Sequence, residues 1–259
     1  MAWNFLRYLA NAARGASTVV PFAERSLLRA DRSGDSSVRV VFARLPDFPE
    51  MKVWRQFLGE GELFVDVGAN VGLYTMLALE CGCSVVALEP APDMVDRVRD
   101  HLALNAIDAT RIQLVQAAAL DRPGTVELAG PDPNRRVAVP GAGGVAAVTL
   151  DSVIGDRAVR GMKIDVEGNE RLVLEGARSI LKRPSLELLQ LEWNDASLAA
   201  LGEERTPLAE LLHQHGFVLF RAEPAGVMTR FDTSSPPGFG ADVFAARGSA
   251  IALLQEIRS

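Results

Sequence analysis

Short apolar runs alternate with amphipathic segments along the chain from Glu62 onward. LFVDV, SVVALEP and RIQLVQ each have the length of a buried strand. The stretches between them, from Gly72 to about Glu80 and from Pro92 to Asn105, place apolar residues at helical intervals. This alternation predicts βαβ units and a largely parallel sheet that is covered by helices.

The alternation of strand and helix patterns changes after the third apolar run, RIQLVQ. AALDRPGTVELAG predicts two short strands about an Arg-Pro-Gly turn, and residues 130–147 are rich in proline, glycine and alanine, which we interpret as an excursion within one domain. GMKIDVEGNE then returns to a strand that ends near Asp165 or Val166, and Asn169 is expected to cap a helix that ends before Pro184. The remaining elements are a strand in SLELLQLEW, a helix from Thr206 and Pro207 to about Gly216, and terminal strands in FVLFRA, GVMTRF and DVFAAR.

The chain length allows one substantial core. Its 259 residues, of which 48% are hydrophobic, suffice for one domain of catalytic size with additions. The opening MAWNFLRYLANAARG has no long uninterrupted apolar segment and no clear cleavage site, so it predicts an amphipathic helix and no integral membrane segment. We therefore divide the chain into an N-terminal helical extension at residues 1–50, which could act as a lid, and a main domain at residues 51–259.

Charge is distributed unevenly along the chain. The net charge of −6 argues against a nucleic-acid binder, so a small or neutral partner is expected. Residues 1–44 nevertheless hold seven arginines against Glu24, Asp31 and Asp35, a local charge of +4. This asymmetry fits an anionic acceptor or a membrane surface, but a solvated helix face is the simpler interpretation, and we favour it. Nothing in the pattern indicates the oligomeric state.

The two cysteines indicate the redox setting. Cys81 and Cys83 are too close together for a useful structural crosslink and too few for a zinc site. A reducing cytoplasm is therefore the simplest localisation.

The stretch FVDVGANVGLYTMLAL predicts a ligand contact between strand and helix. The strand stops near Asp66, and Gly68 and Gly72 allow tight backbone angles at the carboxyl edge of the sheet, where ligands bind in such folds. A dinucleotide motif, G-x-G-x-x-G, would need glycine at Asn70 and Leu73. A carboxylate beside the bend also repels phosphate, so a cationic or zwitterionic ligand is favoured, and S-adenosylmethionine fits.

Three motifs together carry a family resemblance. FVDVGANVG, ALEP and MKIDVEGNERLVLEGA, in this order, resemble the FkbM-type methyltransferases, a branch of the class I S-adenosylmethionine-dependent enzymes. The resemblance extends from about residue 62 to 193, and a weaker similarity continues to residue 246. It implies a doubly wound, mostly parallel, Rossmann-like α/β sheet of seven strands with the last strand antiparallel. It also implies, for the most part, O-methylation of sugar or polyketide hydroxyls.

The resemblance implies a set of cofactor-binding residues. It places the bend around the methionine part of the cofactor and Glu89 on the ribose hydroxyls, where a carboxylate can accept both hydroxyl protons. In related folds the adenine lies after the third strand, here near Gln116 and Ala117. The full set of expected cofactor-binding residues is Asp66, Gly68, Ala69, Asn70, Gly72, Glu89, Pro90, Gln116, Ala117 and Asp165.

The end of the fourth strand offers candidates for a general base. An alcohol loses a proton when it is methylated, and a positioned carboxylate, histidine or lysine can accept it. Alternation places Lys163, Asp165 and Glu167 on one side of the strand, and the resemblance makes Asp165 and Glu167 the leading pair. The simpler alternative is that Asp165 caps the following helix while Glu167 and Glu170 complement its positive end.

Glu192 matches an acidic position in many relatives and is a further catalytic candidate. Trp193 and Asn194 follow it, where a histidine is common in the family, so the resemblance assigns no catalytic base to these two positions. The spacing of Asp165, Glu167 and Glu192 allows a divalent metal but does not demand one. None of His101, His213 and His215 is expected to be the catalytic base.

These observations predict an O-methyltransferase that acts on a hydroxyl of a sugar or secondary metabolite, of macrolide or glycoside type, in natural-product biosynthesis. Three alternatives stay open: an N-methyltransferase on an amino sugar, an NAD-dependent oxidoreductase, and a noncatalytic module that keeps the cofactor pocket. Residues 1–50 and 130–147 could cover the acceptor, but neither stretch identifies it.

Overall fold

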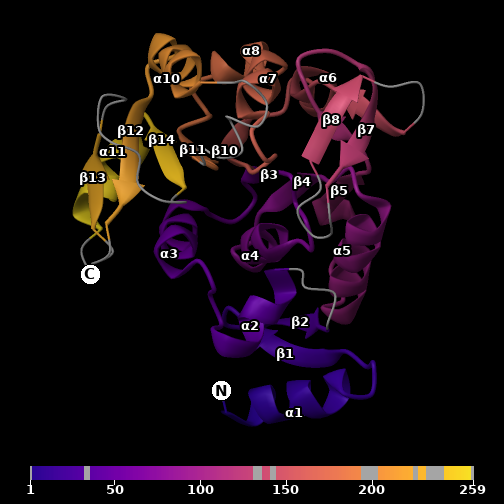
Figure 1. Cartoon of the computed structure of the whole chain (residues 1–259). Coiled ribbons are helices and arrows are strands. Elements are labelled where there is room, and N and C mark those ends of the chain that lie inside the picture. Colours follow the sequence, from indigo (N-terminus) through magenta and orange to yellow (C-terminus); the bar gives the residue numbers. More distant parts are fainter. Residues whose placement is uncertain are drawn as a thin grey trace.

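The central sheet of the computed structural model has eight strands (Figure 1). The structure describes residues 2–31, 36–130, 136–140, 144–193, 204–223, 227–231 and 242–257. Across the sheet the order is β13 (Met228–Arg230), β12 (Val218–Ala222), β14 (Val243–Ala246), β11 (Leu188–Leu191), β10 (Val159–Ile164), β3 (Leu63–Val67), β4 (Ser84–Leu88) and β5 (Ile112–Val115).

The direction of the strands confirms the predicted mostly parallel sheet. The run from β5 through β4, β3 and β10 to β11 is parallel, and β14 is antiparallel to both of its neighbours. Seven of the eight strands therefore correspond to the expected sheet with its last strand antiparallel. The eighth, β13, pairs antiparallel with β12 at the edge.

Helices cover both faces of the sheet. Alternate residues of β3 show this, because Phe64 packs into one hydrophobic core and Val65 into the other. One face carries α3 (Phe48–Phe57), α4 (Leu73–Glu80), α5 (Pro92–Leu104) and α11 (Ser249–Glu256). The opposite face carries α6 (Leu150–Ile154), α7 (Glu170–Glu175), α8 (Arg178–Leu181) and α10 (Arg205–Gln214). The sheet is therefore doubly wound, as predicted.

The N-terminal region contains the predicted helix and, after it, a β-hairpin that the sequence did not predict. After α1 (Ala2–Ala12), the strands β1 (Thr18–Phe22) and β2 (Ser26–Ala30) form an antiparallel hairpin; η1 (Ser36–Val38) and α2 (Arg39–Phe42) follow. The hairpin turn is held by Glu80 at the end of α4, whose carboxylate accepts hydrogen bonds from the backbone N–H groups of Glu24, Arg25 and Ser26. This support comes from far along the chain, so the local pattern did not reveal it.

The excursion after β5 forms a second, smaller sheet. Its order is β6 (Ala118–Ala119), β9 (Val145–Val148), β7 (Gly124–Ala129) and β8 (Arg136–Pro140), while residues 131–135 and 141–143 of the predicted excursion lie outside the described residues. The two strands expected about the Arg-Pro-Gly turn exist but do not pair with each other, because β9 lies between them.

The expected helix after Asn169 is divided into α7 and α8. The break falls at Gly176, where a Cβ atom would lie 2.0 Å from the backbone oxygen of Leu120 beside the small sheet. The close approach of two chain segments therefore interrupts a helix that the apolar spacing predicted as continuous. No helix within the described ranges is long and apolar enough to cross a membrane.

Candidate active site

The carboxyl ends of β3, β4 and β10 border a cavity of about 1120 Å³, its open mouth included. Most of the predicted site residues line it, but Gly72 and Gln116 do not, and neither does Glu192. The predicted residues in the lining are Asp66, Gly68, Ala69, Asn70, Glu89, Pro90, Ala117, Lys163, Asp165 and Glu167.

The two glycines of the bend are required by packing, and their expected contact with a ligand remains a prediction. Gly68 has a φ of +76°, and a Cβ atom there would lie 1.9 Å from the backbone oxygen of Asp165. Gly72 has a φ of +84°, and its Cβ atom would meet the Val98 side chain at 3.2 Å. These glycines let β3 approach β10 and let α4 begin against α5.

Asn70 and Glu89 connect the tips of β3 and β4. The Asn70 N–H donates to Glu89 Oε2 at 2.7 Å, and the Ala91 N–H donates to Glu89 Oε1 at 2.9 Å. Burial raises the pKa of Glu89 to about 7, against the opposing effect of these two backbone hydrogen bonds. Each carboxylate oxygen keeps a further lone pair, so Glu89 can also accept hydrogen bonds from a ligand in the cavity.

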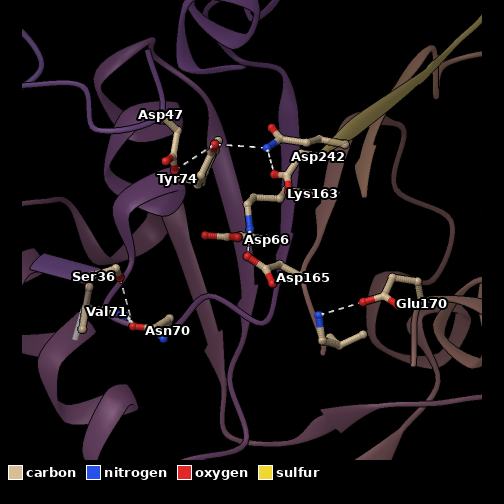
Figure 2. A network of polar contacts seen from close by, with 12 residues as sticks. Ser36, Asp47, Asp66, Asn70, Val71, Tyr74, Lys163, Asp165, Glu170 and Asp242 are labelled. Atoms are coloured by element: carbon tan, nitrogen blue, oxygen red, sulfur yellow. Dashed lines mark hydrogen bonds and ion pairs between the residues drawn. The ribbon is translucent and has the colours of Figure 1, made fainter. Parts of the chain in front are cut away.

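Asp66 is buried at the end of β3. Thr75 Oγ1 donates to its carboxylate at 2.6 Å, and burial raises its pKa although Lys163 lies nearby (Figure 2). The carboxylate of Asp66 therefore lies beside the bend, as the sequence predicted, and it faces the one lysine that lines this cavity.

The buried Lys163 forms an ion pair with the partly exposed Asp165. Its Nζ lies 2.7 Å from Asp165 Oδ2 and 4.7 Å from the centre of the Tyr74 ring. Burial alone would lower the pKa of Lys163, but the carboxylates of Asp165, Asp242 and Asp66 outweigh it and raise the pKa. Because the ammonium stays charged at neutral pH, Lys163 cannot act there as a general base.

Asp165, Glu167 and Glu192 form a group of three carboxylates. One oxygen of each lies within 4.8 Å of the others, and the residues come from the ends of β10 and β11. Glu167 has a φ of +56°, a costly conformation for a residue with a long side chain. Three oxygen ligands at this separation could hold a divalent cation. Lys163 pairs with one member of the group, Asp165.

The acidic side chain that binds the backbone of the loop before α7 belongs to Glu170, the first residue of the helix. Glu170 (labelled in Figure 2), not Asp165, accepts hydrogen bonds from backbone N–H groups. The donors are Val166 and Gly168, each at 3.2 Å, and burial raises the pKa of Glu170 to about 7. Asn169 occupies the N-cap position of α7 but makes no capping hydrogen bond with its side chain. Its side chain instead lines the cavity.

A chain of polar contacts that the sequence did not predict includes Asp47 and Tyr74, which line another wall of the cavity (Figure 2). The Tyr74 hydroxyl donates to Asp47 Oδ2 at 3.3 Å and accepts from Gln190 Nε2 at 3.0 Å. Gln190 Nε2 also donates to Asp242. Burial, followed by the nearby carboxylates of Asp47 and Asp242, raises the pKa of Tyr74 well above its usual value, so the phenol stays neutral.

The N-terminal region supplies part of this wall. Ser36, Arg39 and Asp47 line the cavity together with the strand tips. Ser36 Oγ lies 3.2 Å from Asn70 Oδ1, which also accepts the Val71 N–H at 2.7 Å (Figure 2). Residues before position 50 are therefore part of the site, and the lid function of this region remains a prediction.

None of the histidines lies at the cavity. His101 is buried in α5, where its Nε2 accepts the Arg29 N–H at 3.0 Å and its Nδ1 therefore donates to Val71 O at 2.8 Å. His213 and His215 end α10, as predicted. Trp193 is buried beneath the Arg205 guanidinium, and Asn194 lies outside the described residues.

This strand order, with acidic side chains at the central strand tips, defines a class I methyltransferase fold. A putative methyltransferase from Streptococcus mutans, solved in complex with SAH, matches with a TM-score of 0.51 at 12% identity, over 78% of this chain and 97% of that chain. Methyltransferase FkbM from Methylobacillus flagellatus KT gives a TM-score of 0.47 at 15% identity, over 94% of this chain and 59% of that chain. Precorrin-6y C5,15-methyltransferase from Geobacter metallireducens GS-15 gives 0.45 at 13% identity, over 78% and 88%.

A profile of the methyltransferase FkbM domain matches residues 66–219. The chain therefore belongs to the FkbM family of S-adenosylmethionine-dependent methyltransferases, as the three sequence motifs predicted. No curated protein sequence matches it significantly. Membership of the family makes the chain a methyltransferase, so the alternatives of an NAD-dependent oxidoreductase and a noncatalytic module are wrong.

Proposed function

We propose that this methyltransferase transfers a methyl group to a hydroxyl of a sugar or secondary metabolite. The observation that carries the proposal is the group of three carboxylates, Asp165, Glu167 and Glu192, of which two line the cavity. A neutral amine is already nucleophilic, whereas an alcohol must lose its proton to the enzyme. Carboxylates that can accept a proton beside the cavity therefore favour methylation of a hydroxyl over methylation of the nitrogen of an amino sugar.

The cavity residues fit S-adenosylmethionine, which supplies a methyl group on a cationic sulfonium. Glu89 is proposed to accept the ribose hydroxyls, and Asp66 with the bend at Ala69 and Asn70 to hold the methionine part. Asn169 offers a further contact: it is 8% exposed, lines the cavity, and its Nδ2 finds no hydrogen-bond acceptor among the residues that the structure describes. A buried donor without an acceptor is costly, and a ligand oxygen would satisfy it.

The chain's own residues then orient the acceptor and remove its proton. Lys163 fixes the Asp165 carboxylate through the ion pair, and Glu167 lies next to it at the end of the same strand. One of these two carboxylates is proposed to accept the hydroxyl proton while the cavity walls align the oxygen with the methyl carbon. Glu192 supports the pair, and Pro90 and Ala117 border the adenosine part.

A divalent cation is the other occupant that the three carboxylates could hold. The proton-transfer role described above needs no metal, because Lys163 already balances one of the negative charges. Turnover in the presence of EDTA, followed by addition of Mg²⁺, separates the two roles. Unchanged turnover supports the proton-transfer role, whereas turnover that is lost and then restored by Mg²⁺ would assign the cluster to a cation.

The test of the proposed function has two stages. Calorimetric titration with S-adenosylmethionine should give binding heat, and matched pairs of glycosides and macrolides that carry either a hydroxyl or an amine should then be assayed with mass detection. Methylation of the hydroxyl member supports the proposal. Methylation confined to the amine member would contradict it and favour an N-methyltransferase. Location in the cytoplasm and a role in natural-product biosynthesis remain predictions.

A further inference from the structure

Helix α1 turns the uncharged polar side chains of Tyr8 and Asn11 toward the rest of the protein. The Tyr8 hydroxyl donates to Asp31 O at 3.2 Å, and Asn11 Nδ2 donates to Thr18 Oγ1 at 3.1 Å and to Ser17 O at 3.4 Å. Helices on a protein surface normally do the reverse and bury their apolar stripe. This orientation leaves the large apolar side chains of α1 facing outward.

The outward side forms a continuous apolar face. Trp3 is 70% exposed, Leu6 58% and Leu9 46%, and their spacing places all three on one side of the helix. Phe5 packs against Phe42 of α2, with the ring centres 5.4 Å apart. The apolar face consists of Trp3, Phe5, Leu6, Leu9 and Phe42; Phe48, at the start of α3, is the other large hydrophobic side chain exposed in the described part of the chain.

The charge around this face is positive although the whole chain is acidic. Arg7 and Arg14, at the helix and just after it, are exposed, as is Arg44 near α2, while the exposed Arg39 pairs with Asp47. The first 44 residues carry +4 in a chain of −6. An outward tryptophan, bulky aliphatic side chains and flanking arginines together are typical of a helix that lies in the interface of an anionic bilayer.

We propose that the apolar face docks on the surface of a membrane that contains anionic lipids. The aromatic and aliphatic side chains would enter the boundary between headgroups and acyl chains, and the arginines would contact the lipid phosphates. An acidic protein partner would explain the charge but not the coherent apolar face, and a second copy of this chain would bring like charges together. The proposal replaces the solvated helix face that the sequence favoured, and it does not depend on the identity of the acceptor.

The cavity adjoins this face along the chain. Arg39 lines the cavity and Phe42, in the same short helix, belongs to the apolar face. In Figure 1 α1 and α2 lie together at the N-terminal end of the molecule. Docking on lipid would therefore hold one wall of the active site close to the bilayer surface.

Trp3 makes the proposal directly measurable. The chain has three tryptophans, and Trp54 and Trp193 are buried, so a blue shift of tryptophan fluorescence on addition of vesicles reports Trp3. We expect a blue shift and co-sedimentation with vesicles of phosphatidylglycerol and phosphatidylcholine, with affinity at least tenfold lower for phosphatidylcholine alone. Added salt should weaken the binding.

Substitutions separate the apolar and the electrostatic parts. Leu6→Glu combined with Leu9→Glu should abolish vesicle binding, and Arg7→Gln combined with Arg14→Gln should weaken it about tenfold or more. The control, Arg122→Gln combined with Arg178→Gln, removes the same charge from exposed positions beyond the N-terminal region and should leave binding unchanged. Unaltered thermal unfolding and affinity for S-adenosylmethionine would show that each variant is folded.

Three outcomes would overturn the proposal. The first is no binding of the wild-type chain to anionic vesicles. The second is vesicle binding that persists in the Leu6→Glu, Leu9→Glu variant. The third is a wild-type dimer, detected by analytical ultracentrifugation, that this variant loses while no vesicle binding is seen, which would assign the apolar face to a second copy of the chain.

Discussion

The two halves of the cavity are built in different ways. The cofactor half comes from residues 66–91, where one bend, one helix start and one strand end follow each other along the chain. In the other half, Asp47 and Tyr74 line the cavity, and they are joined by side-chain hydrogen bonds to Gln190 and Asp242 outside its lining. These four residues lie far apart in the sequence. The comparison teaches that backbone geometry fixes the first half, while a network of side chains fixes the second.

The largest effect is expected from the backbone of the cofactor half. Gly68→Ala has two costs: the residue keeps a positive φ that is strained for alanine, and its Cβ atom would collide with Asp165 O. We therefore expect the free energy of unfolding to fall by about 3 kcal/mol or more and cofactor binding to be lost. Gly61→Ala is the matched control, because Gly61 has a similar φ of +78° but open space, and should cost only about 1 kcal/mol. Equal losses in chemical denaturation of the two variants would contradict the close-approach explanation.

The next largest effect concerns the carboxylates between the two halves. Asp165→Asn combined with Glu167→Gln should lower kcat on the best acceptor by about 10²- to 10⁴-fold, because no base accepts the hydroxyl proton. The dissociation constant for S-adenosylmethionine should change much less. Asp156→Asn, at an exposed position, serves as the control. Full turnover in the double variant would remove these residues from the mechanism.

The pH dependence of cofactor binding tests Glu89. With a pKa raised to about 7, Glu89 gains a proton as the pH falls and loses the negative charge that attracts the ribose hydroxyls. We expect the dissociation constant for S-adenosylmethionine to rise about tenfold between pH 8 and pH 6, as for a single protonation that blocks binding. Glu89→Gln should bind more weakly and without this dependence. A pH profile that persists in Glu89→Gln would point to a different group, with Glu170 the first to examine.

The smallest effect should come from a single hydroxyl in the acceptor half. Tyr74→Phe removes the contact with Asp47 and Gln190, so the KM for the acceptor should rise a few-fold, while affinity for S-adenosylmethionine stays constant and stability falls by about 1 to 2 kcal/mol. Tyr8→Phe removes the other tyrosine hydroxyl of the chain, whose partner is Asp31 O. It should leave the KM unchanged, and equal KM values for both variants would show that the network does not shape the acceptor site.

Several features of the site were predictable because they depend on residues close together in the chain. Strand periodicity predicted that β3 ends near Asp66 and that Glu89 follows β4. It also predicted that the side chains of Lys163 and Asp165 lie on the same side of the strand. The role of Gly68 was not predictable in the same way. Its need for a glycine arises from the carbonyl of Asp165, almost a hundred residues later.

Some residues at the site belong to no recognisable sequence motif. Tyr74 lies two residues after Gly72, in the first turn of a helix at the sheet edge, so its position near the site could have been inferred. Asp47 gave no such signal, because nothing in its surroundings indicates that the N-terminal region returns to the strand tips. Gln190 within an apolar strand was a hint of an internal polar contact, but its partners, Trp54 and Tyr74, come from other elements.

The sequence by itself determined the alternation of strands and helices, the bend between β3 and α4, and the acidic strand ends, because local periodicity and backbone preferences specify them. Only the tertiary structure decided that the N-terminal hairpin is held by Glu80, that helix α7 ends at Gly176, and that α1 turns its apolar side outward. An amphipathic sequence specifies that a helix has an apolar face. The contacts made by its polar face, here through Tyr8 and Asn11, decide the direction in which the apolar face points.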